Sequence, residues 1–476
     1  MIKTSQLIEA LRSMNKKEFR EFGKYIQSPY FNNRSEVIRF YEYIKKFYPA
    51  LSSKELTPDK LFRKVYPGKK YNEATMRKLI SLALKQAVNF FAVSGFQSNE
   101  IEYSVKMLDK LREKNLSSLF EKNVKTIEDL FLKTPHTFGY YESKFNFTTL
   151  KNGYYLHTDE TQMVKGFQKE IDDFMEYFLS VILLLYIRLS EWSKARNISF
   201  DLKFYDEVLM HFKKYDYNNI PLVSLYYNML MLLKTEEEKY YYELQNGRNK
   251  FEKLITPMDD YNIAVTMMQY CYKKVQKGDA EFRRQQFEVV NLVLEKNMIP
   301  PGNIEPYFFI NSIRNAAIIH EFEWCNNFIE NYKDKLNQER LTETLSYSYA
   351  LVDFYKRNYE IALRHISAIN IERSTLKTEF KNIQLVIYFE MNYTDELISL
   401  IDSYKHFLNR DKEIAEKTKE LCSEFIKIVT KLVKIKLDGN IESAELLKNE
   451  ISKKNYFNFK EWVIMKLDSF INSKSR

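Results

Sequence analysis

The chain has 476 residues, of which 45% are hydrophobic and 29% are charged, a composition ordinary for a globular protein with a continuous core. It contains only ten glycines and ten prolines, against 35 tyrosines and 35 phenylalanines. Because sheet turns and phosphate-binding loops both need glycine, this composition disfavours sheet proteins and nearly excludes enzymes that bind phosphate on glycine-rich loops. It predicts an all-α protein whose long helices pack through aromatic side chains.

Positive charge is concentrated at the N-terminal end of the chain. Residues 1–100 contain 19 Lys and Arg against 9 Asp and Glu, a net charge of +10. The remaining 376 residues contain 54 against 55, a net charge of −1. Such an asymmetry is typical of a separate module with an acidic partner or a nucleic acid.

The first hundred residues are expected to form four helices. The second of them is expected from about Ser35 to Tyr48. The polar stretch from Ser94 to Asn99 indicates a domain boundary. The other three helices start at capping patterns: Asn15 with Glu18, Thr57 with Pro58, and Asn72. We therefore predict a basic helical module over residues 1–95 and a second domain over residues 96–476.

A group of basic residues surrounds the predicted turn at Pro67-Gly68, and we call it the basic patch. Tyr66 and Tyr71 flank the turn and could stack or donate hydrogen bonds. The six members of the basic patch are Arg63, Lys64, Lys69, Lys70, Arg77 and Lys78. They could contact phosphates or an acidic protein, although the same residues would also suit a solvated surface, and no signature of a DNA-reading helix is present. All three alternatives stay open.

Beyond the module, amphipathic segments recur with breaks roughly every 20 residues. Such spacing is typical of α-solenoids, which are built from helix pairs. The apolar run Phe174–Leu189 is too short to cross a bilayer, so we expect a central helix that is buried on all sides, and no membrane partner.

The C-terminal half carries an internal echo. Residues 354–359 (FYKRNY) are followed 34 residues later by residues 388–393 (YFEMNY), and Phe322 lies 37 residues before Tyr359. An offset of 34 residues is the period of tetratricopeptide (TPR) repeats. Asp353 and Glu396 depart from that pattern, so we predict degenerate TPR-like helix hairpins, with coincidence in an aromatic-rich chain as the alternative.

Motifs for enzyme chemistry are missing from the sequence. The three cysteines and six histidines are scattered without metal-ligand spacing, so the cysteines are expected to be buried thiols in a reducing compartment. The acidic runs Glu236–Glu238 and Asp259-Asp260 stand where helices should start, which their interaction with the helix dipole explains. We expect no cofactor, no metal and no catalytic residue. The N-terminal segment has no apolar run suited to a secretory signal, which favours a cytoplasmic location.

Several short segments at both ends of the chain resemble landmarks of an uncharacterised family of large all-helical bacterial proteins. These segments are Ser28–Asn32, Tyr66–Asn72, Leu400–Tyr404 and Phe407–Arg410. The resemblance implies an intracellular helical-repeat protein and supplies no activity, ligand or catalytic residue.

The sequence thus predicts a non-enzymatic helical-repeat scaffold that binds a protein or peptide partner on a concave surface lined by aromatic anchors. The alternative is a nucleic-acid-associated regulatory protein whose N-terminal module contacts phosphate. A hydrolase or transferase hidden in the superhelix would need a cavity lined by convergent polar residues.

Overall fold

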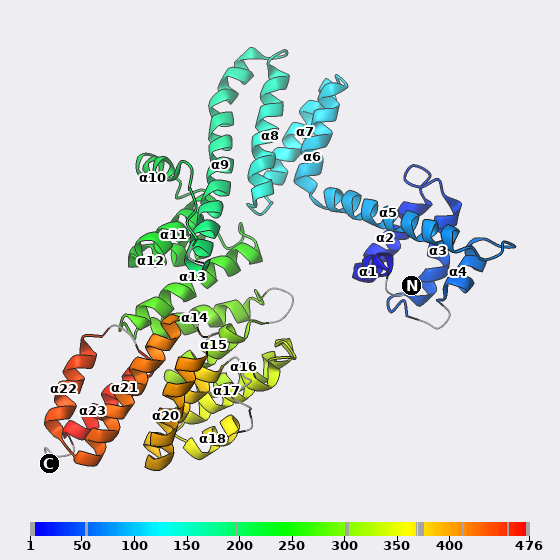
Figure 1. The fold of residues 1–476 in the computed structure, drawn as a ribbon. Helices are drawn as coiled ribbons and strands as arrows, with labels where there is room; N and C mark the ends of the chain where they lie inside the picture. The colour runs from blue at the N-terminus through cyan, green and yellow to red at the C-terminus, as the bar shows by residue number, and fades with distance from the viewer. Residues whose placement is uncertain are drawn as a thin grey trace. The chain divides into compact units, whose positions relative to one another are not determined.

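The computed structural model describes residues 5–52, 56–196, 198–299, 304–367, 369, 376–411, 414, 416–454 and 457–472. Within these ranges the chain forms 23 α-helices, two short 3-10 helices and no strand (Figure 1). An isolated β-bridge joins Ile304 to Leu336. The predicted all-α class is confirmed for the described residues.

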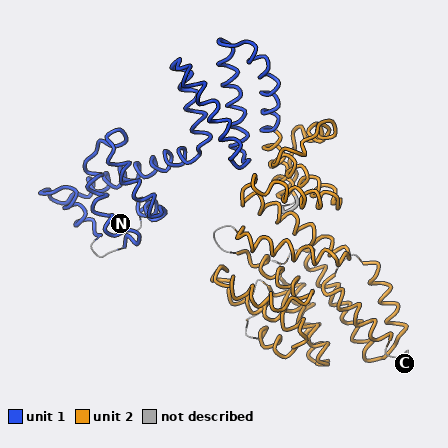
Figure 2. The backbone as a smooth tube through the Cα atoms, turned by 180° about the vertical axis from the view of Figure 1, so that it is seen from behind, with its two compact units in different colours: residues 1–178 blue, residues 179–476 orange. Residues whose placement is uncertain are grey.

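The helices fall into two compact units, residues 1–178 and residues 179–476, which Figure 2 colours separately. Unit 1 contains α1 (Gln6–Ser13), α2 (Lys16–Gln27), α3 (Ser35–Ile44), η1 (Lys45–Phe47), α4 (Pro58–Val65), α5 (Glu73–Ser98), α6 (Glu100–Glu113), α7 (Ser117–Phe131), α8 (Phe138–Tyr155) and the first half of α9 (Glu160–Arg196).

The predicted helix starts in the first hundred residues are confirmed. Asn15 and Glu18 form a capping box, and the side chains of Thr57 and Asn72 accept hydrogen bonds from the first turns of α4 and α5. One hydrophobic core, formed by buried residues between Leu7 and Phe90, joins α1 to α5. Helices α1 to α5 therefore share one core within the larger unit 1.

Helix α5 is the central helix of that core and also continues beyond it. Its buried side chains include Leu79, Ala83 and Ala87, while the polar stretch from Ser94 to Asn99 is helical up to Ser98. The boundary predicted at residue 95 thus falls inside α5. Among the described residues, α5 is the one helix long and apolar enough to cross a membrane by length and composition, a test that core helices also pass.

Unit 2 contains the remaining helices and η2. They are α10 (Tyr205–Lys214), α11 (Pro221–Thr235), α12 (Glu238–Lys250), α13 (Pro257–Gln276), α14 (Phe282–Glu295), α15 (Pro306–Ile318), α16 (Phe322–Tyr332), η2 (Lys333–Lys335), α17 (Leu341–Tyr355), α18 (Tyr359–Ser367), α19 (Lys377–Glu390), α20 (Thr394–Arg410), α21 (Glu416–Asp438), α22 (Ile441–Ser452) and α23 (Lys460–Asn472). Packing falls mainly between sequential helices, as in the pairs α11–α12, α13–α14 and α17–α18.

In seven helix pairs, the first helix ends in a turn where one residue adopts a left-handed conformation. These residues are Asn115, Glu236, Gly278, His320, Arg357, Asn392 and Gly439. After α17, the Asn358 amide donates to the Asp353 carbonyl at 2.8 Å, which is the hydrogen bond of a Schellman motif. Five of the seven residues are not glycine, so five of these helices end in a left-handed conformation that usually favours glycine.

The left-handed residues also measure the spacing of the helix pairs. From Glu236 onward they lie 35 to 47 residues apart, so the spacing is irregular. Arg357 and Asn392 are equivalent in the two turns and lie 35 residues apart, although the sequence echo at this place has an offset of 34. As a result, Tyr359 is the first residue of α18, whereas Tyr393 is the N-cap residue that precedes α20.

The last helix of unit 2 folds back onto helices far away in the sequence. Glu461 on α23 pairs with Arg283 on α14 at 2.6 Å, and the Trp462 indole donates to Glu390 on α19 at 2.5 Å. Phe459 packs against Phe354 at the end of α17, with ring centroids 5.8 Å apart. In a simple solenoid each repeat contacts only its neighbours, so this end of the chain departs from that pattern.

Candidate functional site

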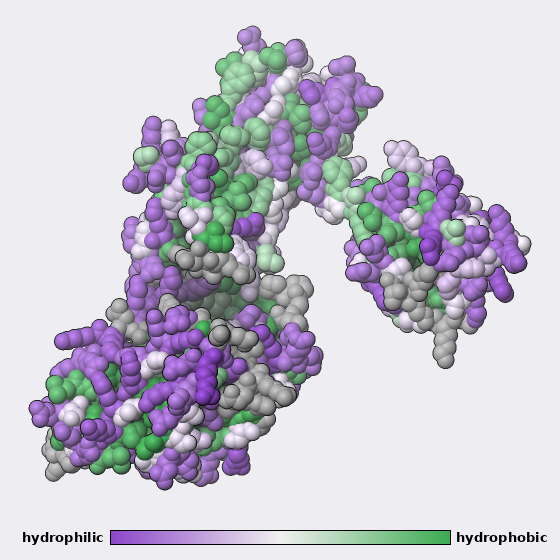
Figure 3. All heavy atoms as spheres, in the orientation of Figure 1, coloured by the Kyte–Doolittle hydropathy of each residue, from purple (hydrophilic) through white to green (hydrophobic). Residues whose placement is uncertain are grey.

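Helix α9 carries a row of exposed apolar side chains, which we call the α9 stripe. Its members are Val164, Phe167, Ile171 and Phe174, which are 58%, 51%, 60% and 44% exposed. The spacings of three, four and three residues place all four side chains on one side of the helix. Figure 3 shows hydrophobic residues gathered along this helix. Single exposed apolar residues are ordinary, but a contiguous row of them typically marks an interaction site.

Polar contacts with α8 fix the orientation of α9. Asp173, whose side chain is fully buried, accepts hydrogen bonds from Thr148 at 2.7 Å and from Lys144 at 3.1 Å. Lys144 also lies 2.5 Å from Glu176. Phe174, at one end of the stripe, packs against Phe145 on α8, with ring centroids 5.4 Å apart. Because the charges beside it are hydrogen-bonded inside the unit, α9 cannot rotate to bury the rest of the stripe against α8 without leaving them unpaired.

The electrostatics of this contact agree with a structural role. Burial lowers the pKa of Lys144, but the carboxylates of Glu176 and Asp173 outweigh that effect and hold the pKa above its usual value. Burial and the nearby Lys144 charge lower the pKa of His136 to about 4, so that imidazole is neutral at physiological pH. The cluster therefore holds fixed charges between two helices.

The α9 stripe corrects one prediction made from the sequence. The run Phe174–Leu189 lies within α9 and includes buried residues such as Leu179 and Leu183, yet Phe174 and Leu185 are 44% and 43% exposed. The helix is therefore not buried on all sides. The run begins ten residues after Val164, so most of the stripe lies in the more polar segment before it. The spacing of three and four residues between its apolar side chains was the sequence pattern that could have predicted the stripe.

The predicted basic patch lies on α4, on the following turn and on the first turns of α5. All six side chains are exposed. Arg77 pairs with Glu73 at 2.6 Å, and the Lys69 ammonium lies 5.7 Å from the Tyr66 ring centroid. The other members form no ion pair with a described carboxylate, so most of the positive charge of the patch faces solvent.

The two tyrosines beside this turn pack onto the core of the module. The ring of Phe62 lies 4.9 Å from that of Tyr66 and 5.3 Å from that of Tyr71. Burial raises the pKa of Tyr66. Tyr71 remains 37% exposed and is the tyrosine of this pair with more surface for a ligand.

The cysteines of the chain are buried among apolar side chains. The three cysteines are free and buried, as predicted, and burial raises the pKa of Cys271 and of Cys325 to about 12. Such thiols are protonated and unreactive at neutral pH. The described residues contain no group of three potential metal-binding side chains.

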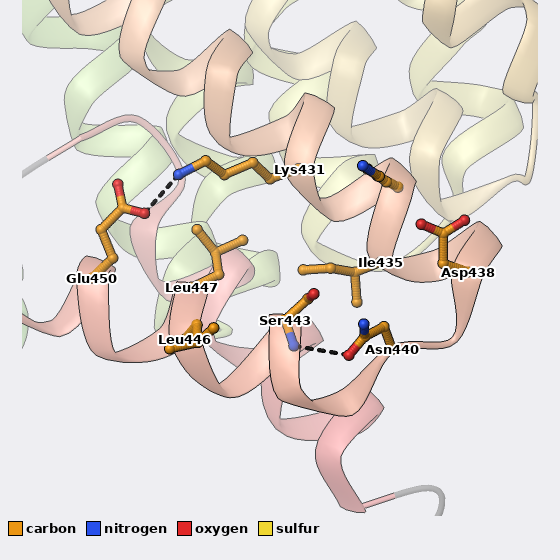
Figure 4. Close-up of a pocket in the computed structure, with 9 residues that line it drawn as sticks. Lys431, Ile435, Asp438, Asn440, Ser443, Leu446, Leu447 and Glu450 are labelled. Atoms are coloured by element: carbon orange, nitrogen blue, oxygen red, sulfur yellow. Dashed lines mark hydrogen bonds and ion pairs between the residues drawn. The ribbon is translucent and has the colours of Figure 1, made fainter.

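A hollow of about 270 Å³ lies between α21 and α22 (Figure 4). Lys431 and Glu450 pair across it at 2.6 Å, and the Asn440 side chain accepts a hydrogen bond from the Ser443 amide at 3.0 Å. The ion pair joins the two helices, and the Asn440 bond caps the start of α22.

Comparison with protein-family models, with curated proteins and with solved structures finds no match to this chain. The resemblance to a bacterial helical family therefore stays a prediction, and functional conclusions rest on the geometry described above.

Proposed function

We propose that the protein is a non-enzymatic helical-repeat scaffold that binds a partner protein through the α9 stripe. The four exposed apolar residues in register on a helix fixed by buried charges carry the proposal. The recurring turn that closes seven helix pairs supports a repeat architecture of the TPR-like kind. So does the packing of first helices on one another, as in α11–α13, α15–α17 and α19–α21.

The occupant that suits this surface best is an amphipathic helix of another protein. Apolar residues separated by alternating steps of three and four form the seam of two packed helices, because this spacing keeps them facing the partner. Phe167 and Phe174 would act as the aromatic anchors that dominate such interfaces.

Position-specific cross-linking in the native cell tests this proposal. A photoreactive phenylalanine analogue replaces Phe167 in the full chain, and a matched variant carries it at Lys165, an exposed residue that points away from the stripe. We expect position 167, but not position 165, to cross-link a single partner protein through a peptide with apolar residues every three or four positions. Equal yields at both positions, cross-links only within this chain, or cross-links to a second copy of it would each overturn the proposal.

A second candidate function is nucleic-acid binding by the basic module, supported by the five basic-patch side chains that form no described ion pair. The double variant Lys64→Gln, Lys70→Gln should bind duplex DNA or RNA more weakly than the full-length wild type does. The slope of log K against log salt concentration should become shallower by about two, because about two fewer counterions are released. Lys122→Gln with Lys125→Gln, which removes two exposed charges from α7, is the matched control. Absence of binding at low salt would exclude this function.

A further inference from the structure

The loop between α2 and α3 presents an exposed tyrosine to solvent. Tyr30 is 88% exposed, the highest value among the exposed large apolar and aromatic side chains of the described residues. Its ring centroid lies 5.0 Å from that of Phe31, with the two rings perpendicular, and Phe31 stacks on Tyr25 of α2 at 4.4 Å. The ring of Tyr30 is therefore anchored at its base by an aromatic neighbour, while most of its surface stays open.

A buried asparagine holds this loop in one conformation. Asn32 is 5% exposed, and its side-chain amide donates to the carbonyls of Ile26 at 2.7 Å and of Arg34 at 3.2 Å. Its side-chain oxygen accepts a hydrogen bond from the Arg34 amide at 3.0 Å. The backbone amides of Phe31 and Asn32 both donate to the carbonyl of Ser28. Because the backbone is already fixed, a partner that contacts the exposed tyrosine would lose little affinity to ordering the loop.

Helix α3 connects this loop to the turn that carries the basic patch. Arg39 lies five residues after Arg34, a distance of about 8 Å along an α-helix. The Arg39 Nε donates to the carbonyl of Val65 at 2.8 Å, directly before Tyr66. Burial raises the pKa of Tyr66, and the charges of Arg39 and Arg34 counteract part of that rise. The α2–α3 loop and the turn after α4 are therefore neighbouring parts of the module surface.

Exposed aromatic rings beside basic groups are the features that proteins use to bind single-stranded nucleic acid, because bases stack on the rings and basic groups follow the backbone. Tyr30 and Tyr71 supply two exposed rings. Lys64 and Lys70 are exposed and form no ion pair with a described carboxylate. Stacking does not depend on an unpaired positive charge, so Tyr30 can take a base although Arg34 already has a glutamate 3.8 Å away.

We infer that the α2–α3 loop and the turn after α4 bind single-stranded nucleic acid, with a base stacked on Tyr30. The inference rests on the second candidate function, nucleic-acid binding by the basic module, and adds the kind of strand that is preferred. Bases in a duplex are already stacked on one another, whereas a single strand leaves its base faces open to an aromatic ring. An acidic peptide would pair with the lysines but would offer the tyrosine ring no flat partner.

Fluorescence anisotropy of the full-length protein at low salt tests the inference with labelled probes. These are oligouridylate and oligothymidylate of about 12 nucleotides, within the usual site size, a duplex of the same length, and a peptide with about as many glutamates. We expect Tyr30→Ala to weaken binding of the single strands about tenfold and of the duplex less than about twofold. Tyr30→Phe keeps the ring and should retain the single-strand affinity.

Tyr242 on α12 provides a matched control outside the module. It is 39% exposed, so Tyr242→Ala removes an exposed tyrosine ring without touching the α2–α3 loop, and it should change no affinity. Since Tyr30 is almost fully exposed, Tyr30→Ala should keep the thermal unfolding midpoint of the wild type, which circular dichroism measures.

Failure of the inference and failure of the second candidate function give different results. If the nucleic acids bind but Tyr30→Ala weakens single strands and duplex equally, or weakens neither, the inference is wrong while nucleic-acid binding by the module stands. If none of the nucleic acids binds at low salt, both are wrong. Tighter binding of the glutamate peptide than of either single strand, lost in Tyr30→Ala, would assign the loop to an acidic protein and so overturn the inference.

Discussion

The ion pair between Arg248 on α12 and Asp260 in the first turn of α13 gives the sharpest test of how the helix pairs are stabilised. The two side chains are 5% and 9% exposed, and Nε of Arg248 lies 2.5 Å from Oδ1 of Asp260. Asp260→Ala would leave the guanidinium buried without a carboxylate. We expect it to lower the free energy of unfolding by about 3–5 kcal/mol, because an uncompensated buried charge costs that much.

A double-mutant cycle separates the pair from its surroundings. Arg248→Met and Asp260→Leu are made singly and together; the combination removes both charges and keeps apolar volume, so we expect it to cost less than either of these single changes. Lys296, which lies 3.5 Å from Asp260, keeps its second partner, Glu252, at 2.7 Å and should stay paired throughout the cycle.

Urea unfolding followed by tryptophan fluorescence measures this cycle in the unit where the pair lies. The three tryptophans, Trp192, Trp324 and Trp462, all belong to residues 179–476, so the signal reports on unit 2. A loss below about 1 kcal/mol for Asp260→Ala, or a double variant whose loss equals the sum of the single losses, would refute the reasoning.

Three further predictions concern the turns, an acid-sensitive pair and the thiols. Arg357→Gly should raise the free energy of unfolding by about 1 kcal/mol, because φ is +65° at this position; a lower urea midpoint would contradict this. Hydrogen bonds from Lys273 and Lys277 lower the pKa of Glu236 to about 2. The stability from this carboxylate is present above about pH 4.5 and lost as pH falls towards 2, so Glu236→Gln should lower stability by a constant amount above about pH 4.5 and flatten the acid unfolding curve between pH 4.5 and 2; equal stability of the two proteins at pH 7 would contradict this. Cys325, with its raised pKa, should react with a thiol reagent at pH 8 only in urea; reaction of the native protein would contradict its burial.

Local signals in the sequence were sufficient to predict much of the N-terminal module. The caps at Asn15, Thr57 and Asn72 form through side-chain bonds to amides within three residues, so they depend little on the rest of the fold. The scarcity of glycine and proline likewise indicated helices. The six members of the basic patch occupy exposed positions on α4, on the following turn and on the first turns of α5.

Features that depend on tertiary packing could not be predicted in the same way. Hydropathy alone indicated that the apolar run of α9 would be buried, whereas Phe174 at its start is 44% exposed although its ring packs against Phe145 on α8. The sequence echo has an offset of 34 residues, whereas the left-handed residues Arg357 and Asn392 lie 35 apart, because these turns are defined by backbone conformation and not by the neighbouring aromatic residues. A left-handed arginine or asparagine has no distinct sequence pattern, unlike glycine.

Charge shows most clearly why a sequence average says little about one part of the surface. Residues 101–476 have a net charge of −1, which directed attention to the N-terminal module. Yet within them Lys377 and Lys381 share one face of α19, and Arg410 shares one face of α20 with Phe407, so packing of the two helices brings the positive groups to one cavity. Asp411, which pairs with Lys377 at 3.3 Å, is an acidic residue in the same lining. Screening limits the reach of a surface charge to about one Debye length, so a net charge summed over a long segment does not describe the charge at any one place on the surface.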